Sequence, residues 1–161
     1  PPPPPPTNHP PTTELYTGTT SSAASDVYKR QLYVKIAPEK IFTITDAGMN
    51  DLIRPTLYDA YHRIQPVVEP KPSGNTVVTD VVGPVCETGD YLALARRLPE
   101  LNTGDLIAVM TAGAYGAVQA SQYNSRLLVP EVLVSGANYC ITRPRTSYEE
   151  MLSAERLPSW L

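Results

Sequence analysis

The chain has 161 residues, of which 42% are hydrophobic and 18% are charged, and its net charge is −3. This length allows one domain with a buried core, and the weak acidic balance excludes the basic surface on which nucleic-acid binding depends. No apolar run approaches the roughly 20 residues that a membrane-spanning helix needs, and the first residues lack the pattern of a signal peptide. The two cysteines, Cys86 and Cys140, are too few for a disulfide framework, so we expect a reduced, cytoplasmic protein.

The beginning of the chain differs in composition from the rest. Eight of the first eleven residues are proline, a composition that favours polyproline II and cannot build a packed core. The Thr- and Ser-rich residues that follow show no sustained period of 2 or 3.6. We therefore interpret residues 1–31 as disordered or foreign to the fold, and residues 32–161 as one mainly β domain. The alternative for the proline tract is a ligand of an SH3-type domain.

Short β-branched and aromatic runs after this segment predict strands. In chain order they are residues 32–36, 41–45, 75–83, 105–110, 117–120 and 131–142, the last being two strands around a Ser-Gly-Ala-Asn turn. Turns with Gly, Pro and Asn separate the runs, so we expect a β-barrel or sandwich rather than alternating βαβ units.

Three helical segments are expected between or after these strands. Pro55 suits a first helical turn, and three apolar residues then share one face: Leu57, Tyr61 and Ile64. Residues 91–98 are predicted to form a short helix or a turn. Near the C-terminus two capping boxes can begin a helix, Thr146 with Glu149 and Ser147 with Glu150.

Arg54 and Tyr58 are the first pair that could carry chemistry. They are four residues apart, so within one helical turn they point to the same side. The guanidinium could bind a carboxylate through two parallel hydrogen bonds, with the tyrosine hydroxyl as a further donor. The alternative is a solvated arginine and a half-buried tyrosine on an ordinary helix face.

Cys86 and Glu87 lie in a loop that contains glycine and proline, and such loops often carry functional groups. A nucleophilic cysteine would need a histidine base, and the chain offers only His9 and His62. A metal site would need more Cys and His ligands than the sequence has, so we expect no metal. A thiol that donates a proton needs fewer partners and stays open, beside the plain alternative of a buried apolar cysteine.

Tyr115 stands among small residues, in the sequence Gly-Ala-Tyr-Gly. Small neighbours let a ligand approach the backbone and leave the ring free to stack or its hydroxyl free to donate. The alternative is a tight turn with a core tyrosine.

Four stretches together resemble the C-terminal part of the diaminopimelate decarboxylases, in the same order and at similar spacing. They are DAGMNDLIRPTLYDAYH, DVVGPVCETGDYLA, LPELNTGDLIAVMTAGAYGAVQASQYNSR and EVLVSG. The resemblance runs from about residue 32 to residue 152. It implies a fold type III pyridoxal-phosphate enzyme with an amino-terminal (β/α)8 barrel, a C-terminal β domain and homodimers with active sites at the interface. The implied reaction converts meso-diaminopimelate to L-lysine and carbon dioxide in lysine biosynthesis.

The resemblance also implies roles for particular residues. Cys86 matches the proton donor, which enters the active site of the neighbouring subunit. The implied substrate-binding residues are Arg54, Tyr58, Glu87 and Tyr115, and Tyr115 also contacts the cofactor. A substrate with two carboxylates and two ammonium groups fits a pocket with an arginine, an acid and hydroxyl donors.

The barrel that carries the family's cofactor-binding lysine is absent from this sequence. The four lysines do not lie in the matching context: Lys29, Lys35, Lys40 and Lys71. We therefore expect half an active site, in a chain that alone neither binds pyridoxal phosphate covalently nor decarboxylates. The alternatives are a non-catalytic β domain that dimerises or binds a partner, and the same part of a related ornithine, arginine or carboxynorspermidine decarboxylase.

Overall fold

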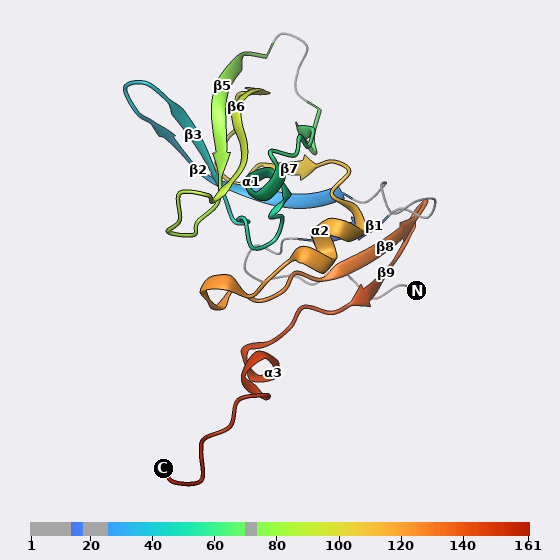
Figure 1. Cartoon of the computed structure of the whole chain (residues 1–161). Helices are drawn as coiled ribbons and strands as arrows, with labels where there is room; N and C mark the ends of the chain where they lie inside the picture. The colour runs from blue at the N-terminus through green and yellow to red at the C-terminus, as the bar shows by residue number, and fades with distance from the viewer. Residues whose placement is uncertain (1–13, 18–25, 70–73) are drawn as a thin grey trace.

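A computed structural model describes residues 14–17, 26–69 and 74–161 (Figure 1). The strands are β1 (Glu14–Thr17), β2 (Asp26–Ile36), β3 (Ile41–Thr45), β4 (Ile64–Pro66), β5 (Thr76–Val82), β6 (Tyr91–Pro99), β7 (Leu106–Val109), β8 (Glu131–Ser135) and β9 (Asn138–Arg143). The helices are α1 (Arg54–Tyr58), α2 (Gly113–Gln119) and α3 (Tyr148–Leu152), with a 3-10 turn at Tyr123–Ser125.

The strands described form one nine-stranded sheet. Its main order is β6-β5-β3-β2-β1-β8-β9, while β7 pairs with both β2 and β4. Most neighbours are antiparallel, but β3 with β5 and β1 with β8 are parallel pairs. The sheet curls into a nearly closed barrel, and the short helices α1 and α2 lie beside it (Figure 1). The expectation of a mainly β barrel or sandwich with short helices is confirmed.

The ordered fold begins before the boundary that the sequence predicted at residue 31. The backbone of β2 already pairs with β7 from Val27 to Arg30, and the side chains of Lys29 and Gln31 are buried. The short strand β1 pairs with β2 and β8. The predicted boundary at residue 31 thus falls inside β2, because the partner strand β7 lies about 80 residues further along the chain and leaves no signal in the local sequence. The rest of the predicted tail lies outside the described residues.

The helix predicted at Pro55 is confirmed, but it is shorter than the apolar pattern indicated. Pro55 occupies the first turn of α1 and is buried. Asp59 ends the helix in a left-handed conformation, with φ of 52°. Tyr61 therefore leaves the helix, and Ile64 enters strand β4. The predicted helical face that joined Leu57 to these two residues does not form.

Two other local predictions were wrong. Residues 91–98, expected as a helix or turn, belong to strand β6, which pairs along β5. A bulge at Ala95 (φ 47°) breaks the alternation of apolar and polar residues that would have revealed the strand. Residues 117–120, expected as a strand, fall largely within α2. At the C-terminus, the capping box that forms is that of Ser147 with Glu150.

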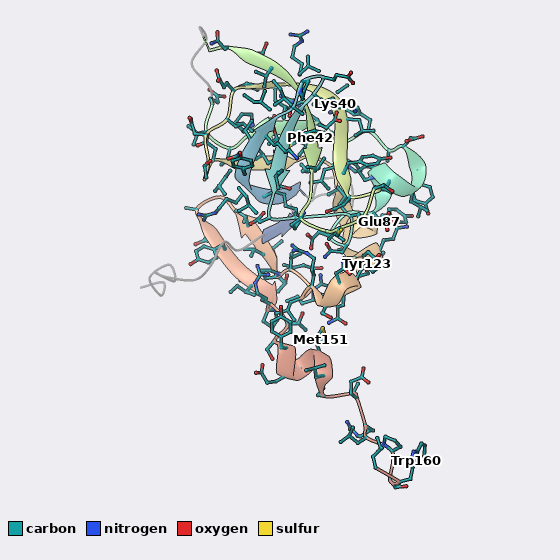
Figure 2. The ribbon with its side chains drawn as sticks, turned by 90° about the vertical axis from the view of Figure 1, so that its left-hand side faces the viewer. Lys40, Phe42, Glu87, Tyr123, Met151 and Trp160 are labelled. Atoms are coloured by element: carbon teal, nitrogen blue, oxygen red, sulfur yellow. The ribbon has the colours of Figure 1, made fainter. Side chains whose placement is uncertain are left out.

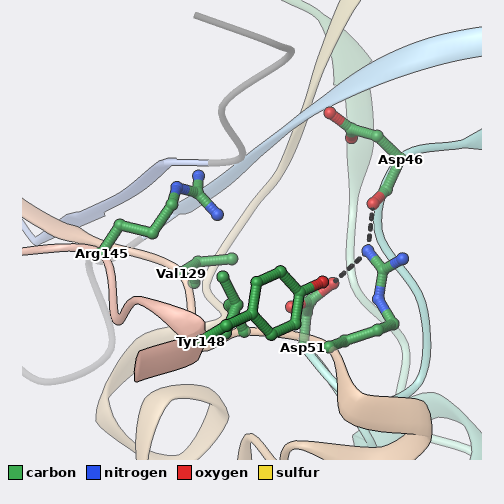
Figure 3. A pocket seen from close by; sticks show the side chains of 7 residues that line it. Asp46, Asp51, Val129, Arg145 and Tyr148 are labelled. Atoms are coloured by element: carbon green, nitrogen blue, oxygen red, sulfur yellow. Dashed lines mark hydrogen bonds and ion pairs between the residues drawn. The ribbon is translucent and has the colours of Figure 1, made fainter. Parts of the chain in front are cut away.

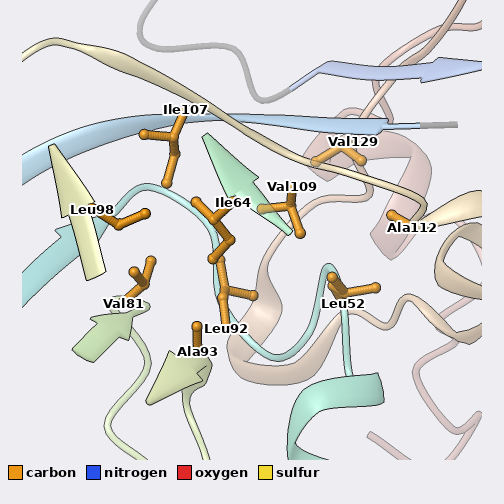
Figure 4. Packing of buried hydrophobic residues seen from close by; sticks show 10 residues of the cluster. All are labelled: Leu52, Ile64, Val81, Leu92, Ala93, Leu98, Ile107, Val109, Ala112 and Val129. Atoms are coloured by element: carbon orange, nitrogen blue, oxygen red, sulfur yellow. The ribbon is translucent and has the colours of Figure 1, made fainter. Parts of the chain in front are cut away.

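The apolar core anchors both short helices (Figure 4). Its buried members are Leu52, Ile64, Val81, Leu92, Ala93, Leu98, Ile107, Val109, Ala112 and Val129. Leu52 lies two residues before α1 and Ala112 directly precedes α2, so each helix starts close to a residue fixed in the core. Gly116 lies where a Cβ atom would come within 3.1 Å of Leu52 Cδ1, which shows how closely α2 approaches the start of α1.

The segment from α3 to the C-terminus extends away from the barrel (Figures 1 and 2). The side chains of Leu157, Trp160 and Leu161 are each more than four-fifths exposed. In the described part of the chain, no helix is long and apolar enough to cross a membrane.

Candidate functional site

Helices α1 and α2 face each other through two pairs of side chains. On α1, Arg54 and Tyr58 are one turn apart, and on α2 Tyr115 and Gln119 are also one turn apart. The Arg54 guanidinium carbon lies 5.8 Å from the centroid of the Tyr115 ring, within the range of a cation–π contact. The Gln119 amide nitrogen donates to the Tyr58 hydroxyl at 3.5 Å. The structure thus brings together three of the predicted site residues.

Arg54 retains unused hydrogen-bonding capacity. Its side chain is partly buried, and its buried Nε atom has no hydrogen-bond partner in the structure. The rings of Tyr58 and Tyr115 are 60% and 64% exposed, so this side of the helices is open. A guanidinium held beside two exposed tyrosines offers several donors to an incoming carboxylate. Because Tyr115 is exposed, the alternative of a core tyrosine at this position is wrong, and Arg54 is half-buried rather than solvated.

The loop that carries Cys86 is fixed from two directions. The Thr56 hydroxyl on α1 donates to the carbonyl oxygen of Gly89. At the other side, the buried Asp90 carboxylate accepts the backbone N–H of Met49 at 2.6 Å and of Val85 at 2.5 Å. Burial raises the pKa of Asp90, while these two hydrogen bonds act to lower it. The loop is therefore tied to the same segment that carries Arg54.

Cys86 and Glu87 both have exposed side chains, and Figure 2 shows Glu87 at the surface of the barrel. Glu87 accepts hydrogen bonds from the Thr88 hydroxyl at 3.0 Å and the Thr88 N–H at 2.8 Å. These bonds, the hydroxyl first, together with the backbone N–H of Gly89, lower the pKa of Glu87, so it is ionised at neutral pH. The Cys86 thiol is free and exposed, which rules out the alternative of a buried apolar cysteine.

His62 does not provide a base for Cys86. Its side chain is only 3% exposed, and its Nδ1 atom lies 3.1 Å from the carbonyl oxygen of Met110. Burial is the main cause that lowers the pKa of His62, and the charges of Arg54 and Arg96 add to it.

A separate polar cluster gathers around Asp51, and Figure 3 shows Asp51 and Asp46 within it. The buried Lys29 ammonium is 3.6 Å from an Asp51 carboxylate oxygen, and Arg126 approaches the same oxygen at 3.9 Å. Arg126 also donates to the backbone carbonyl of Asp46. Burial lowers the pKa of Lys29, although the neighbouring Asp51 opposes this shift.

A cavity of about 190 Å³ adjoins this cluster, and no predicted site residue lines it. Its walls are Asp46, Asp51, Arg126, Leu127, Val129, Arg145 and Tyr148. In the described residues, no three His, Cys, Asp or Glu side chains gather in a way that could hold a metal ion.

Sequence reasoning missed the residues that hold the site in place. Asp90 closes the Cys86 loop, and Asn50 and His62 connect α1 to segments about 50 to 70 residues away. Asp90 had one local signal, because an acid that follows glycine at the end of a loop often accepts backbone N–H groups. Asn50 and His62 had none, since their partners are distant in sequence.

The comparisons with known proteins agree with this architecture. Residues 23–113 match the sequence profile of the family described as "Pyridoxal-dependent decarboxylase, C-terminal sheet domain". The diaminopimelate decarboxylase of Zymomonas mobilis is 48% identical over 138 residues, which are 86% of this chain and 32% of that protein.

Two solved structures show the same fold with comparable coverage. The diaminopimelate decarboxylase of M. jannaschii in co-complex with L-lysine has a TM-score of 0.80 and 31% identity, over 87% of this chain and 32% of that one. The Helicobacter pylori enzyme complexed with L-lysine has a TM-score of 0.74 and 39% identity, over 82% and 32%. The chain thus spans about one third of the length of the relatives it matches. By its profile match and its fold, the chain belongs to the pyridoxal-dependent decarboxylases, of which it represents the C-terminal sheet domain.

Proposed function

We propose that this chain is the C-terminal domain of a diaminopimelate decarboxylase, which releases L-lysine and carbon dioxide from meso-diaminopimelate. The observation that carries the proposal is the joining of three elements: Arg54 and Tyr58 on α1, Tyr115 on α2, and the Cys86 loop that Thr56 ties to α1. The structures of the M. jannaschii and Helicobacter pylori relatives contain L-lysine, the product of this proposed reaction.

The residues present fit a substrate with two carboxylates and two ammonium groups. The Arg54 guanidinium, whose Nε atom is unpaired, can bind one carboxylate, and the tyrosine hydroxyls can donate beside it. Glu87, ionised at neutral pH, attracts an ammonium group at the far end of the substrate. The exposed Tyr115 ring has room to contact both substrate and cofactor.

Pyridoxal phosphate, when bound, supplies the electron sink for the pair of electrons left as carbon dioxide departs. The described lysines do not offer the amine that the cofactor needs next to this site. Lys29 is buried against Asp51, Lys40 is paired with Asp80 at 2.9 Å, and Lys35 lies on β2 where this strand pairs with β3. The lysine and the phosphate site therefore belong to the amino-terminal barrel that the family resemblance implies, and we expect the chain alone to be inactive.

Cys86 then acts as the proton donor. Its thiol projects from a loop that is tied down at Thr56 and at Asp90, and it is exposed rather than turned into the protein's own core. This position suits a thiol that reaches an active site completed by a second subunit, as expected for a homodimer. The thiol delivers its proton to the substrate carbon that has lost carbon dioxide. A reducing, cytoplasmic location keeps both free cysteines as thiols.

The test is to replace the matching domain of the full-length Zymomonas mobilis enzyme with residues 26–161, which include the whole of β2, and to measure lysine formation. We expect an active dimer in which Cys86→Ala lowers kcat at least 100-fold while assembly and substrate KM change little. Cys140→Ala is the matched control, because this second exposed cysteine lies on β9 and should leave the rate unchanged.

Two outcomes would contradict the proposal. An active chimera in which Cys86→Ala has no effect would remove the role of the thiol. A chimera that dimerises, binds pyridoxal phosphate and still forms no lysine would favour a non-catalytic domain, or a domain for a different amino-acid substrate. A panel with ornithine, arginine and carboxynorspermidine separates the last two cases.

A further inference from the structure

The segments that carry α1 and α2 are joined at both of their ends. Ser121, just beyond α2, donates its N–H to the carbonyl of Asn50 at 2.8 Å, and the Asn50 amide nitrogen lies 3.5 Å from the Ser121 carbonyl oxygen. At the opposite end, His62 Nδ1 lies 3.1 Å from the Met110 carbonyl oxygen. The Met110 N–H donates to the backbone carbonyl oxygen of Arg63 at 2.8 Å. Residues 50–62 and 110–121 therefore run antiparallel, with fixed ends.

The buried histidine is held from a third side as well. Arg96 on β6 donates from its guanidinium to the His62 backbone carbonyl at 2.8 Å, and the same guanidinium stacks 4.1 Å above the Tyr61 ring. A carbonyl oxygen can only accept, so the Nδ1 atom that faces Met110 carries a proton and donates it. His62 thus connects the exit of α1 both to β6 and to the residue that leads into α2.

Both helices need such external support. α1 has five residues and α2 has seven, lengths at which an isolated helix is unstable in water. The direct contacts between them, one cation–π contact and one long hydrogen bond, are weak. The relative placement of Arg54 and Tyr115 therefore depends on the joined ends of their segments, in addition to the core packing of Leu52 and Ala112.

We propose that His62 is a positioning residue of the site, which sets the separation of the Arg54–Tyr58 pair from Tyr115, and that Asn50 does the same at the other end. The effect of this positioning on substrate binding rests on the proposed decarboxylase function. The positioning of the two helices does not, and it can be measured on the isolated chain.

The first experiment compares His62→Leu with His62→Asn in the isolated chain by NMR. Leucine has a similar size but cannot donate to Met110, whereas the asparagine amide can. We expect His62→Leu to shift the Tyr115 ring and Arg54 Hε resonances, and His62→Asn to restore most of the wild-type positions. Leu98→Ala, a core change on β6, is the control for general loss of stability.

If Leu98→Ala shifts the same resonances as much as His62→Leu does, or if His62→Leu shifts none, the positioning role is disproved. Should His62→Leu fail to fold, Asn50→Ala tests the same idea. It removes the side-chain contact to Ser121 but leaves the backbone hydrogen bond in place. Unchanged Tyr115 and Arg54 resonances in folded Asn50→Ala would then overturn the inference.

The second experiment uses the full-length chimera described above. We expect His62→Leu to raise the substrate KM about 10-fold or more with a smaller change in kcat, and His62→Asn to stay within about threefold of wild type. If His62→Leu lowers kcat and leaves KM unchanged, a role in substrate positioning is contradicted. If the wild-type chimera is inactive, the proposed function fails while the NMR comparison still decides the inference.

Discussion

Thr56 on α1 donates its hydroxyl hydrogen to the carbonyl oxygen of Gly89 in the Cys86 loop. This single bond joins two stretches that the sequence separates by 33 residues. Because α1 also carries Arg54 and Tyr58, the bond couples the proposed proton donor to the proposed carboxylate site.

Replacing Thr56 with valine should loosen the Cys86 loop. Valine keeps the size of the side chain but removes the donor, which should lower the free energy of unfolding by about 1 kcal/mol. The Cys86 thiol should then react faster with a disulfide reagent, whereas Cys140 in the same molecule provides an internal control. Equal acceleration of both thiols would show general destabilisation instead, and no acceleration would show that the bond does not restrain the loop.

Asp90→Ala should be more harmful than the change at Thr56. It removes the acceptor of two buried backbone N–H groups, those of Met49 and Val85, so we expect a loss of roughly 2–3 kcal/mol in urea unfolding. Asp90→Asn keeps one carbonyl acceptor and should lose less. Glu39→Ala, at an exposed turn, is the control for removing a carboxylate. A loss no greater than that of Glu39→Ala would show that the carboxylate does not brace the loop.

Arg54→Lys should weaken substrate binding in the chimera although it preserves the charge. Lysine cannot bind a carboxylate through the planar pair of donors that a guanidinium offers. We expect KM for meso-diaminopimelate to rise roughly 10- to 100-fold, the equivalent of one strong charged hydrogen bond. Arg97→Lys, on an exposed position of β6, should be neutral. Equal effects at positions 54 and 97 would contradict the assignment.

The stability of the chain should fall as the pH is lowered through the range in which His62 titrates. Burial lowers the pKa of His62 in the folded chain below its ordinary value of 6.5. Below about pH 6.5 the unfolded chain therefore binds more protons than the folded one, and the free energy of unfolding decreases until the folded-state pKa is passed. His62→Asn should remove this part of the pH dependence in urea titrations between about pH 5 and 7.5. An identical slope in both proteins would disprove it.

Local sequence patterns predicted the elements that a short motif of a few neighbouring residues begins or turns. Pro55 located α1, Ser147 with Glu150 located α3, and the Ser-Gly-Ala-Asn turn located the β8–β9 hairpin. The pattern failed at β6, where Asp80 on the neighbouring strand accepts the N–H of Ala95 and stabilises a bulge. No local rule anticipates such a partner.

The candidate site likewise contains residues that the sequence identified and residues that only the distant contacts of the fold reveal. The family resemblance named the candidate site residues, and the structure brings three of them together, Arg54, Tyr58 and Tyr115. Their supports, Asn50, His62 and Asp90, act through contacts that form only when distant segments meet. Helix propensity and periodicity carry no information about such contacts, so these residues could not be predicted.

The pairing of Asn50 with Ser121 has a consequence for biosynthesis. A chain still emerging from the ribosome cannot close this contact until residue 121 is free, and β2 likewise waits for β7. Such non-local closures slow folding to the range of milliseconds to seconds, about that typical of β-barrels. The segments that carry α1 and α2 must then be among the last to join, whereas Thr56 and Asp90, which brace the Cys86 loop, are both synthesised before residue 121.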